Sequence, residues 1–287
     1  MKIGWIGLGA MGWPMAGHLH RAGLLSAVWN RSSEKSAAFA DQHPDVTVVD
    51  TLTELTGLVE VIAVCVSADD DLIAVVEALA GHLQPGQIVV DHSTVSPATA
   101  RALAASLAGN DVGFVDAPVT GGVEGAIKGS LAIMGGGEWD HFHALEPAFR
   151  AYGRVHHHLG PSGSGQAAKA VNQLMVAGIA EAVCESLALM ELLDLPREPM
   201  LEILSGGAAG NWFLDKRGRS MLADKFEVGF DPKLLVKDLK ICQALCAESG
   251  FASAVVDLAL ADYTELVASG ETGRDISALI RHKLPLR

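Results

Sequence analysis

Short apolar runs alternate with helical patterns through the first half of the chain. The runs that predict strands lie at residues 2–6, 26–29, 59–66 and 87–90, with further candidates at 112–115, 131–134 and 155–159. Helical patterns extend from Met11 to Ala22 and from about Ser33 onward. Alternating strands and helices favour a parallel sheet with crossover helices.

The pattern becomes entirely helical after residue 165. Helices are predicted at residues 167–193, 198–204, 231–249 and 252–268, with a flexible break at 206–212. Three glycines and a proline cluster between residues 160 and 165, which is typical of a domain boundary. We therefore expect an α/β class: a parallel-sheet domain at 1–162 and an all-α domain at 163–287.

Charge and apolar content narrow the classes of partner. With 34 acidic and 21 basic residues, the formal net charge is −13, which disfavours nucleic acid and anionic membranes as partners. The four scattered cysteines suit a reducing compartment, so a cytoplasmic location is expected. The apolar stretch 171–193 contains three glutamates and predicts a buried helix instead of a membrane span. Glu181 and Glu185 are expected to form an exposed acidic strip on it.

A glycine-rich turn follows the first predicted strand. Its residues are Gly7, Leu8, Gly9, Ala10, Met11 and Gly12, a GxGxxG pattern that leads into a helix. The first glycine allows a tight turn, the second admits a pyrophosphate, and the third lets the helix pack closely. In this strand-turn-helix context the pattern predicts a Rossmann-type dinucleotide domain.

The residues after the second strand bear on the choice of cofactor. NAD-selective sites commonly have an acidic residue here, whereas this chain has Asn30, Arg31 and Ser32. No carboxylate repels a 2′-phosphate, and Arg31 offers donors for one. NADP(H) is therefore expected, with NAD(H) also possible; in the alternative interpretation Arg31 only lies over the adenine.

Three further segments carry candidate chemistry. Ser93 and Thr94 follow a strand and either cap a helix or also contact the nicotinamide. Thr120, Gly121 and Gly122 form either a plain turn or a site where a hydroxyl and backbone N–H groups bind a carboxylate.

The third segment opens the long predicted helix. Lys169 lies among alanines, and Asn172 and Gln173 follow at i+3 and i+4, on the same side of the helix. An amine removed from water gives up its proton more readily, which suits proton exchange with a hydroxyl or carbonyl oxygen. Taken alone, a lysine on a helix is more commonly an ordinary surface residue.

Several motifs together resemble the β-hydroxyacid dehydrogenase family. They are the GLGxMGxPMA opening (Gly7 to Ala16), Ser93-Thr94 before Pro97, the segment Asp116 to Gly122, GxGxxxKxxN (Gly163 to Asn172) and Lys237-Asp238-Leu239. The resemblance implies that Lys169 is the general acid/base, that Thr120, Gly121 and Gly122 bind the substrate carboxylate, and that Asn172 positions the ligand. It also implies that Thr94 and Lys237 contact the nicotinamide side of the cofactor.

The resemblance implies a hydride transfer between a nicotinamide and a small 3-hydroxy acid or its semialdehyde. Many relatives have Asn where this chain has Gln173, so the substrate pocket differs in shape. Trp212 either closes over that pocket or only packs between the helices. An imine reductase is the enzymatic alternative, although such enzymes generally lack a lysine at position 169. The non-enzymatic alternative is a scaffold that binds NADP(H) without catalysis. Apolar helices in the second half predict a homodimer or homotetramer.

Overall fold

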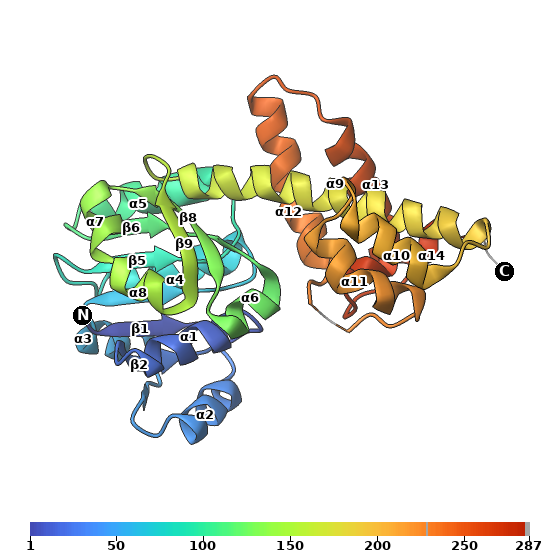
Figure 1. Cartoon of the computed structure of the whole chain (residues 1–287). Helices are drawn as coiled ribbons and strands as arrows, with labels where there is room; N and C mark the ends of the chain where they lie inside the picture. The colour runs from blue at the N-terminus through green and yellow to red at the C-terminus, as the bar shows by residue number, and fades with distance from the viewer. Residues whose placement is uncertain (228, 285–287) are drawn as a thin grey trace. The chain divides into compact units, whose positions relative to one another are not determined.

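In the computed structural model, which describes residues 1–227 and 229–284, the chain forms two compact units. They comprise Met1–Lys169 and Ala170–Arg287 and are described separately (Figure 1).

The first unit is built on a nine-stranded sheet in the order β3-β2-β1-β4-β5-β6-β8-β7, with β9 beside β8. The strands are β1 Ile3–Ile6, β2 Leu25–Trp29, β3 Thr47–Val48, β4 Val61–Val64, β5 Ile88–Asp91, β6 Gly113–Asp116, β7 Val119–Thr120, β8 Leu131–Gly137 and β9 Gly153–His158. Strands β1 to β6 pair in parallel, whereas β8 is antiparallel to β6 and β7. The predicted parallel sheet is confirmed.

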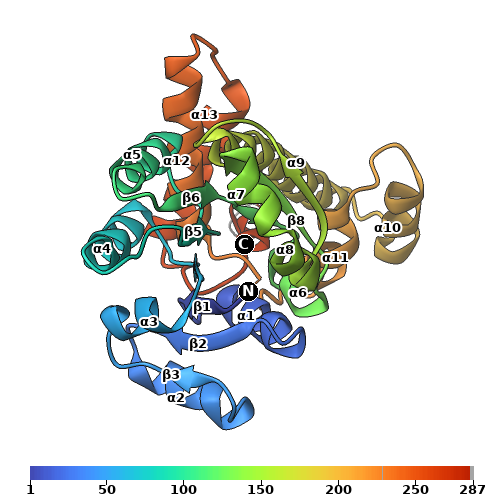
Figure 2. The ribbon, with the colours of Figure 1, turned by 90° about the vertical axis from the view of Figure 1, so that its left-hand side faces the viewer.

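Helices cover both faces of this sheet, with α4 and α5 on one face and α1 and α8 on the other (Figure 2). The helices are α1 Gly12–Arg21, α2 Ser33–Gln42, α3 Leu52–Leu58, α4 Asp69–Ala80, α5 Pro97–Ala108, α6 Gly122–Lys128, α7 Trp139–Ala144 and α8 Glu146–Tyr152. Central strands such as β1 and β4 are buried at every position, because apolar helices pack on both sides.

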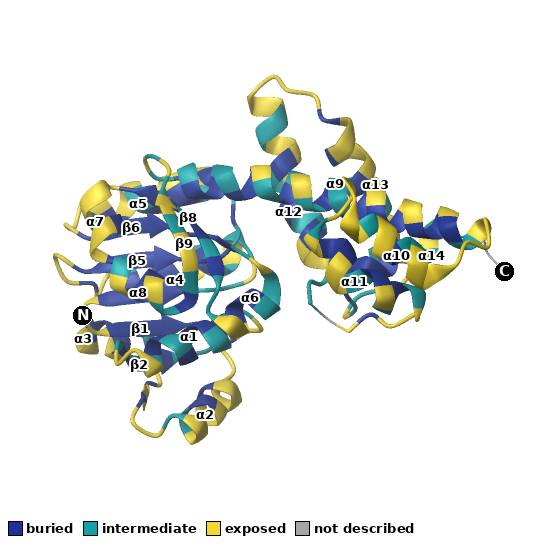
Figure 3. Ribbon diagram, viewed as in Figure 1, coloured by how far each residue is buried: buried dark blue, intermediate teal, exposed yellow. Residues whose placement is uncertain are grey.

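The second unit is helical, as predicted. Its elements are the greater part of α9 Ser164–Leu192, α10 Arg197–Gly206, α11 Trp212–Leu222, α12 Pro232–Glu248, α13 Ala254–Ala268, the 3₁₀ turn η1 Ile276–Leu279 and α14 Ile280–Lys283. Leu187, Phe213, Leu235, Tyr263 and Leu279 belong to its core, and the outward faces are exposed (Figure 3).

Helix α9 is long and apolar enough to cross a membrane by length and composition alone. Half of its most apolar window is buried within the protein, and core helices of soluble proteins pass the same test. The expected exposed acidic strip on α9 is wrong at one position. Glu181 is only 5 % exposed and pairs with Lys283 at 2.8 Å, because α14 places a cation against α9.

Candidate active site

The turn between β1 and α1 has the geometry that a pyrophosphate requires. Gly7 has a φ of +97°, and a Cβ there would lie 2.1 Å from the Cys65 carbonyl oxygen. A Cβ on Gly12 would lie 1.9 Å from the Gly7 oxygen, whereas one on Gly9 would have no atom within 4 Å. The first and third glycines therefore permit close backbone packing, and the second faces open space where a ligand can approach. The residues present fit a dinucleotide.

Asn30 holds this turn in place. Its Oδ1 accepts the Leu8 N–H at 2.8 Å, and its Nδ2 donates to the Ser32 carbonyl at 3.0 Å. The next residue, Arg31, is 86 % exposed in its side chain and pairs with Asp71 of α4 at 3.0 Å. The predicted adenosine end therefore has an exposed cation at the surface, with a carboxylate beside it.

Two buried aspartates that end neighbouring strands anchor the start of α9. Asp116 Oδ1 accepts the Gly163 N–H at 2.8 Å, and Oδ2 accepts the Gln166 N–H at 3.0 Å. Gln166 in turn donates Nε2 to the Ser93 carbonyl at 2.8 Å and to Asp91 at 3.3 Å. Burial raises the pKa of Asp116, and the backbone N–H groups oppose that rise.

This anchoring brings Lys169 beside the predicted carboxylate segment. Lys169 is only 7 % exposed, and its Nζ donates to the Val119 carbonyl at 2.9 Å. The next residues are Thr120, Gly121 with a φ of +130° and Gly122 with a φ of +65°. Both glycines adopt a backbone conformation that L residues rarely tolerate, so a side chain at either position would strain the turn. The structure therefore places a buried amine at the Val119 carbonyl, which directly precedes Thr120 and the double-glycine turn in the chain.

The two residues predicted at the nicotinamide side in the first unit follow β5. Ser93 accepts the Val66 N–H on its Oγ at 2.8 Å and donates its own N–H to Asp91 at 2.9 Å. Ser93 is buried and Thr94 is half-buried. Ser93 therefore holds the ends of β4 and β5 together. The cap of α5 is Ser96, whose Oγ accepts the Thr99 N–H.

In the second unit, two hydrogen bonds and an ion pair connect the predicted residues of α9 and α12. Asn172 Nδ2 donates to Gln173 Oε1 at 2.8 Å, and Gln173 Nε2 donates to Asp238 Oδ2 at 2.6 Å. Lys237 Nζ lies 3.1 Å from Asp238 Oδ1. Gln173 is 3 % exposed, so both ends of its side chain act within the protein.

Trp212, the remaining candidate of the second unit, is the first residue of α11. Its side chain is 48 % exposed, and the Arg217 guanidinium lies 5.5 Å from its ring centroid. Trp212 is therefore at the surface of its own unit, with a cation against one face of the ring.

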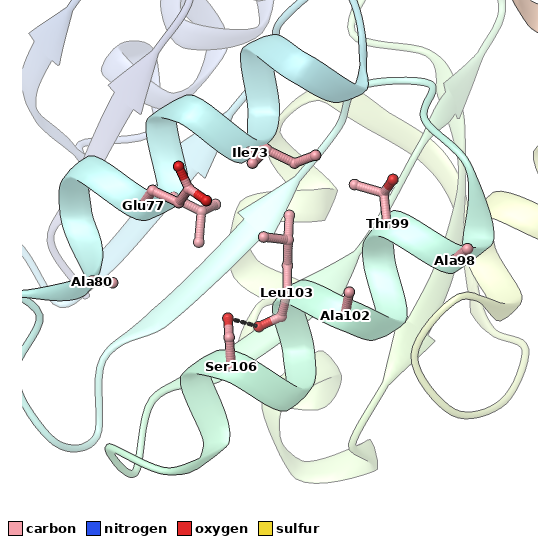
Figure 4. A pocket seen from close by; sticks show the side chains of 9 residues that line it. Ile73, Glu77, Ala80, Ala98, Thr99, Ala102, Leu103 and Ser106 are labelled. Carbon is pink, nitrogen blue, oxygen red and sulfur yellow. Dashed lines mark hydrogen bonds between the residues drawn. The ribbon is translucent and has the colours of Figure 1, made fainter.

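A surface groove of the first unit lies away from these residues. It has a volume of about 630 Å³ between α4 and α5 and is lined by side chains such as Ile73, Leu103 and Ser106 (Figure 4). No predicted site residue lines it. Sequence reasoning missed Asp91, Asp116 and Gln166, although an acidic residue that ends each of two adjacent strands was a usable signal.

Two family models match the chain. The NAD-binding domain of 6-phosphogluconate dehydrogenase matches residues 2–160. The NAD-binding region of NADP-dependent 3-hydroxyisobutyrate dehydrogenase matches residues 163–283. Together they span both units.

Full-length relatives agree with these matches. The chain is 35 % identical over 284 residues to the Arabidopsis thaliana protein named probable 3-hydroxyisobutyrate dehydrogenase-like 1, mitochondrial, covering 97 % of this chain and 84 % of the relative. It is 31 % identical over 298 residues to the NAD-dependent L-serine dehydrogenase of Pseudomonas aeruginosa, covering 97 % and 96 %.

A solved structure matches the fold over the same extent. The Mycobacterium tuberculosis 3-hydroxyisobutyrate dehydrogenase with L-serine has a TM-score of 0.86 and 26 % identity, covering 98 % of each chain. With the glycine turn, the anchored Lys169 and matches that extend over both units, the chain belongs to the β-hydroxyacid dehydrogenase family and is an NAD(P)-binding oxidoreductase.

Proposed function

We propose that the protein transfers a hydride between NADP(H) and a small 3-hydroxy acid or its semialdehyde, with Lys169 as the general acid/base. The observation that carries this proposal is the buried Lys169 amine, which lies 2.9 Å from the carbonyl next to Thr120, in the same unit as the dinucleotide turn.

In this proposal, the cofactor is held by the residues predicted for it from the sequence. The turn Gly7, Leu8, Gly9, Ala10, Met11 and Gly12 takes the pyrophosphate, and Asn30, Arg31 and Ser32 surround the adenosine ribose. Ser93, Thr94 and Lys237 contact the nicotinamide end. The bound nicotinamide supplies the hydride in reduction and accepts it in oxidation.

The protein orients the substrate and manages the proton. Thr120, Gly121 and Gly122 bind the carboxylate, while Asn172, Gln173 and Trp212 shape the rest of the pocket. In oxidation, neutral Lys169 accepts the proton of the C3 hydroxyl as the hydride leaves C3. In reduction, Lys169 as an ammonium protonates the oxygen that develops negative charge. Burial supports this role because it keeps the amine out of bulk water, where it could exchange its proton with solvent in place of the substrate.

Arg31 supports the NADP(H) preference. Its exposed guanidinium follows β2, where a 2′-phosphate would lie, and no carboxylate occupies positions 30 to 33. The named activity of the Pseudomonas aeruginosa relative with NAD keeps NAD(H) as the alternative cofactor.

A two-direction activity screen tests the proposal. Reduction of tartronate, methylmalonate and succinic semialdehydes and of glyoxylate is measured with NADPH and with NADH, and oxidation of 3-hydroxyisobutyrate and L-serine with the oxidised cofactors. At least one of these compounds is expected to be a substrate, and Lys169→Ala should lower kcat for it by about 100- to 10,000-fold. Exposed Lys240 of α12 provides the control, since Lys240→Ala should retain wild-type rates.

Other outcomes identify the alternatives. Turnover of cyclic imines without turnover of any hydroxy acid would favour an imine reductase. NADPH binding without any turnover would favour a non-catalytic scaffold. Wild-type activity in Lys169→Ala would refute the assigned role of the amine.

We further propose a cytoplasmic homodimer or homotetramer that binds neither nucleic acid nor membranes. Val171 and Met175, which are 68 % and 63 % exposed one turn apart on α9, supply two apolar side chains that a second copy of the chain could cover. Light scattering coupled to size-exclusion chromatography measures the mass, and a 30 kDa species would contradict the oligomer.

A further inference from the structure

Three aromatic side chains pack together beneath the candidate site. Trp5 of β1, His92 after β5 and Tyr152 at the end of α8 are 0 %, 2 % and 1 % exposed. The rings of Trp5 and His92 stack at a centroid distance of 5.6 Å and an angle of 13°, and Tyr152 meets His92 edge-on at 5.4 Å. Large aromatics are ordinary in a core, but the polar atoms of these three are all directed at specific partners.

Trp5 is hydrogen-bonded to the dinucleotide turn. Its indole Nε1–H donates to the carbonyl of Gly7 at 3.0 Å, two residues further along the chain. Gly7 is the residue with the left-handed φ that starts the turn. The hydrogen bond therefore fixes the direction of the peptide that leads into Leu8 and Gly9.

His92 is hydrogen-bonded to the segment that leads to Thr120. Its Nδ1 lies 2.7 Å from the Ala117 carbonyl oxygen, and its Nε2 lies 2.9 Å from the Tyr152 hydroxyl. A carbonyl only accepts, so Nδ1 carries the hydrogen, and Nε2 of the neutral ring accepts from Tyr152. Burial lowers the pKa of His92 to about 4, which keeps the ring neutral near pH 7.

The Ala117 segment depends on such contacts at several points. Its N–H donates to the Asp91 carbonyl at 2.7 Å, and the carbonyl of Pro118 accepts the Met134 N–H at 3.0 Å. Ala117 is buried, and the hydrogen bond from His92 satisfies its carbonyl oxygen. Two residues later, Val119 accepts Lys169.

We propose that Trp5, His92 and Tyr152 form a positioning cluster, in which Trp5 sets the geometry of the dinucleotide turn and His92, oriented by Tyr152, sets that of the carboxylate-binding segment. The proposal rests on the proposed function, because it names the residues that shape the two binding segments. The stacked pair holds the two segments at one spacing without contacting either ligand.

Two substitutions separate the roles. Trp5→Phe keeps the aromatic ring and removes the donor, so the dissociation constant for NADPH, measured by its fluorescence, should rise about 3- to 10-fold while the substrate KM stays within about twofold. His92→Leu should instead raise the substrate KM by about tenfold and leave NADPH binding within about twofold.

Conservative variants test the hydrogen bonds themselves. His92→Asn keeps a donor at the Nδ1 position and should restore most of the wild-type KM, whereas Tyr152→Phe, which leaves Nε2 without its donor, should raise KM about threefold. Phe142 belongs to the same core but points no polar atom at either segment, so Phe142→Leu is the matched stability control.

The proposal is overturned if Trp5→Phe and His92→Leu change both constants by equal factors, or by no more than Phe142→Leu at a similar melting temperature. A ligand-free measurement separates this from a failure of the proposed function. The amide resonances of Gly121 and Gly122 should shift in His92→Leu and not in His92→Asn, whichever acid is turned over. Unchanged resonances in His92→Leu would refute the role of His92.

Discussion

At the end of β2, the neighbouring residues Asn30 and Arg31 have different roles. Both ends of the Asn30 amide group are hydrogen-bonded within the protein, to the Leu8 N–H and to the Ser32 carbonyl, so Asn30 shapes the turn. Arg31 extends into solvent and pairs with Asp71 at 3.0 Å. An exposed pair of this kind contributes at most about 1 kcal/mol, so a 2′-phosphate can displace the carboxylate from the guanidinium.

Arg31→Ala should raise the KM for NADPH by about 10- to 100-fold, because a charge-assisted contact to the 2′-phosphate is lost. The KM for NADH should change by about twofold or less, since NADH has no phosphate there. Steady-state kinetics with both cofactors measure the ratio. An equal rise for both would mean that Arg31 only covers the adenine.

Asp71→Asn should have the opposite effect. The carboxylate both competes for Arg31 and repels a phosphate bound to it, so its removal should lower the KM for NADPH by about 2- to 10-fold. Asp70 is exposed one residue earlier on α4 and has the same charge, so Asp70→Asn is the control. A raised KM for NADPH in Asp71→Asn would show that the carboxylate orients Arg31 for binding.

The start of α9 shows how one element is positioned by another. Asp116 accepts the N–H groups of Gly163 and Gln166, so the end of β6 holds the first turn of the helix. Lys169 lies three residues after Gln166, about one turn along, and its direction follows from this anchor. Sequence spacing alone placed Lys169 on a helix but did not say what oriented that helix.

Asp116→Ala should lower the free energy of unfolding by about 2–4 kcal/mol, because two buried N–H groups lose their acceptor. It should also lower kcat at least tenfold by releasing the helix that carries Lys169. Asp116→Asn keeps one acceptor and should be milder in both respects. Urea unfolding and steady-state kinetics make the comparison. A stability loss with unchanged kcat would separate Asp116 from the positioning of Lys169.

For the molecule as a whole, stability depends on pH through its buried groups. Burial lowers the pKa of His92 to about 4, from about 6.5 in an unfolded chain. Between these values the unfolded state binds more protons than the folded state. The contribution of His92 to the free energy of unfolding is therefore complete above about pH 6.5 and is lost as the pH falls toward 4. Asp116 acts with the opposite sign. Because burial raises its pKa in the folded protein, its protonation on lowering the pH increases the free energy of unfolding.

The His92 contribution should amount to about 3 kcal/mol across that window. His92→Asn removes the titrating group, so its free energy of unfolding should fall less steeply than that of the wild type between pH 6.5 and 4. Urea unfolding at several pH values gives both slopes. Identical slopes would mean that His92 is protonated without unfolding.

The local sequence determined the fold class and the glycine-rich dinucleotide turn. The β1-turn-α1 unit follows from an apolar run, three glycines and a helical pattern, which are all near neighbours in the chain. Helix α11 was not predicted, because its sequence contains four charged residues and a glycine. Burial of Phe213, Leu214 and Met221 stabilises this helix in the folded protein, although its apolar pattern is weak.

Tertiary structure alone decided which polar residues meet. Asp116 contacts Gly163 across 47 positions, Gln166 contacts Ser93 across 73, and His92 joins Tyr152 across 60. Glu181 is buried because Lys283, far along the chain, neutralises it. Periodicity and motifs report contacts between near neighbours in sequence. The partner of a buried polar group depends instead on how whole elements pack, and that information is spread over the entire chain.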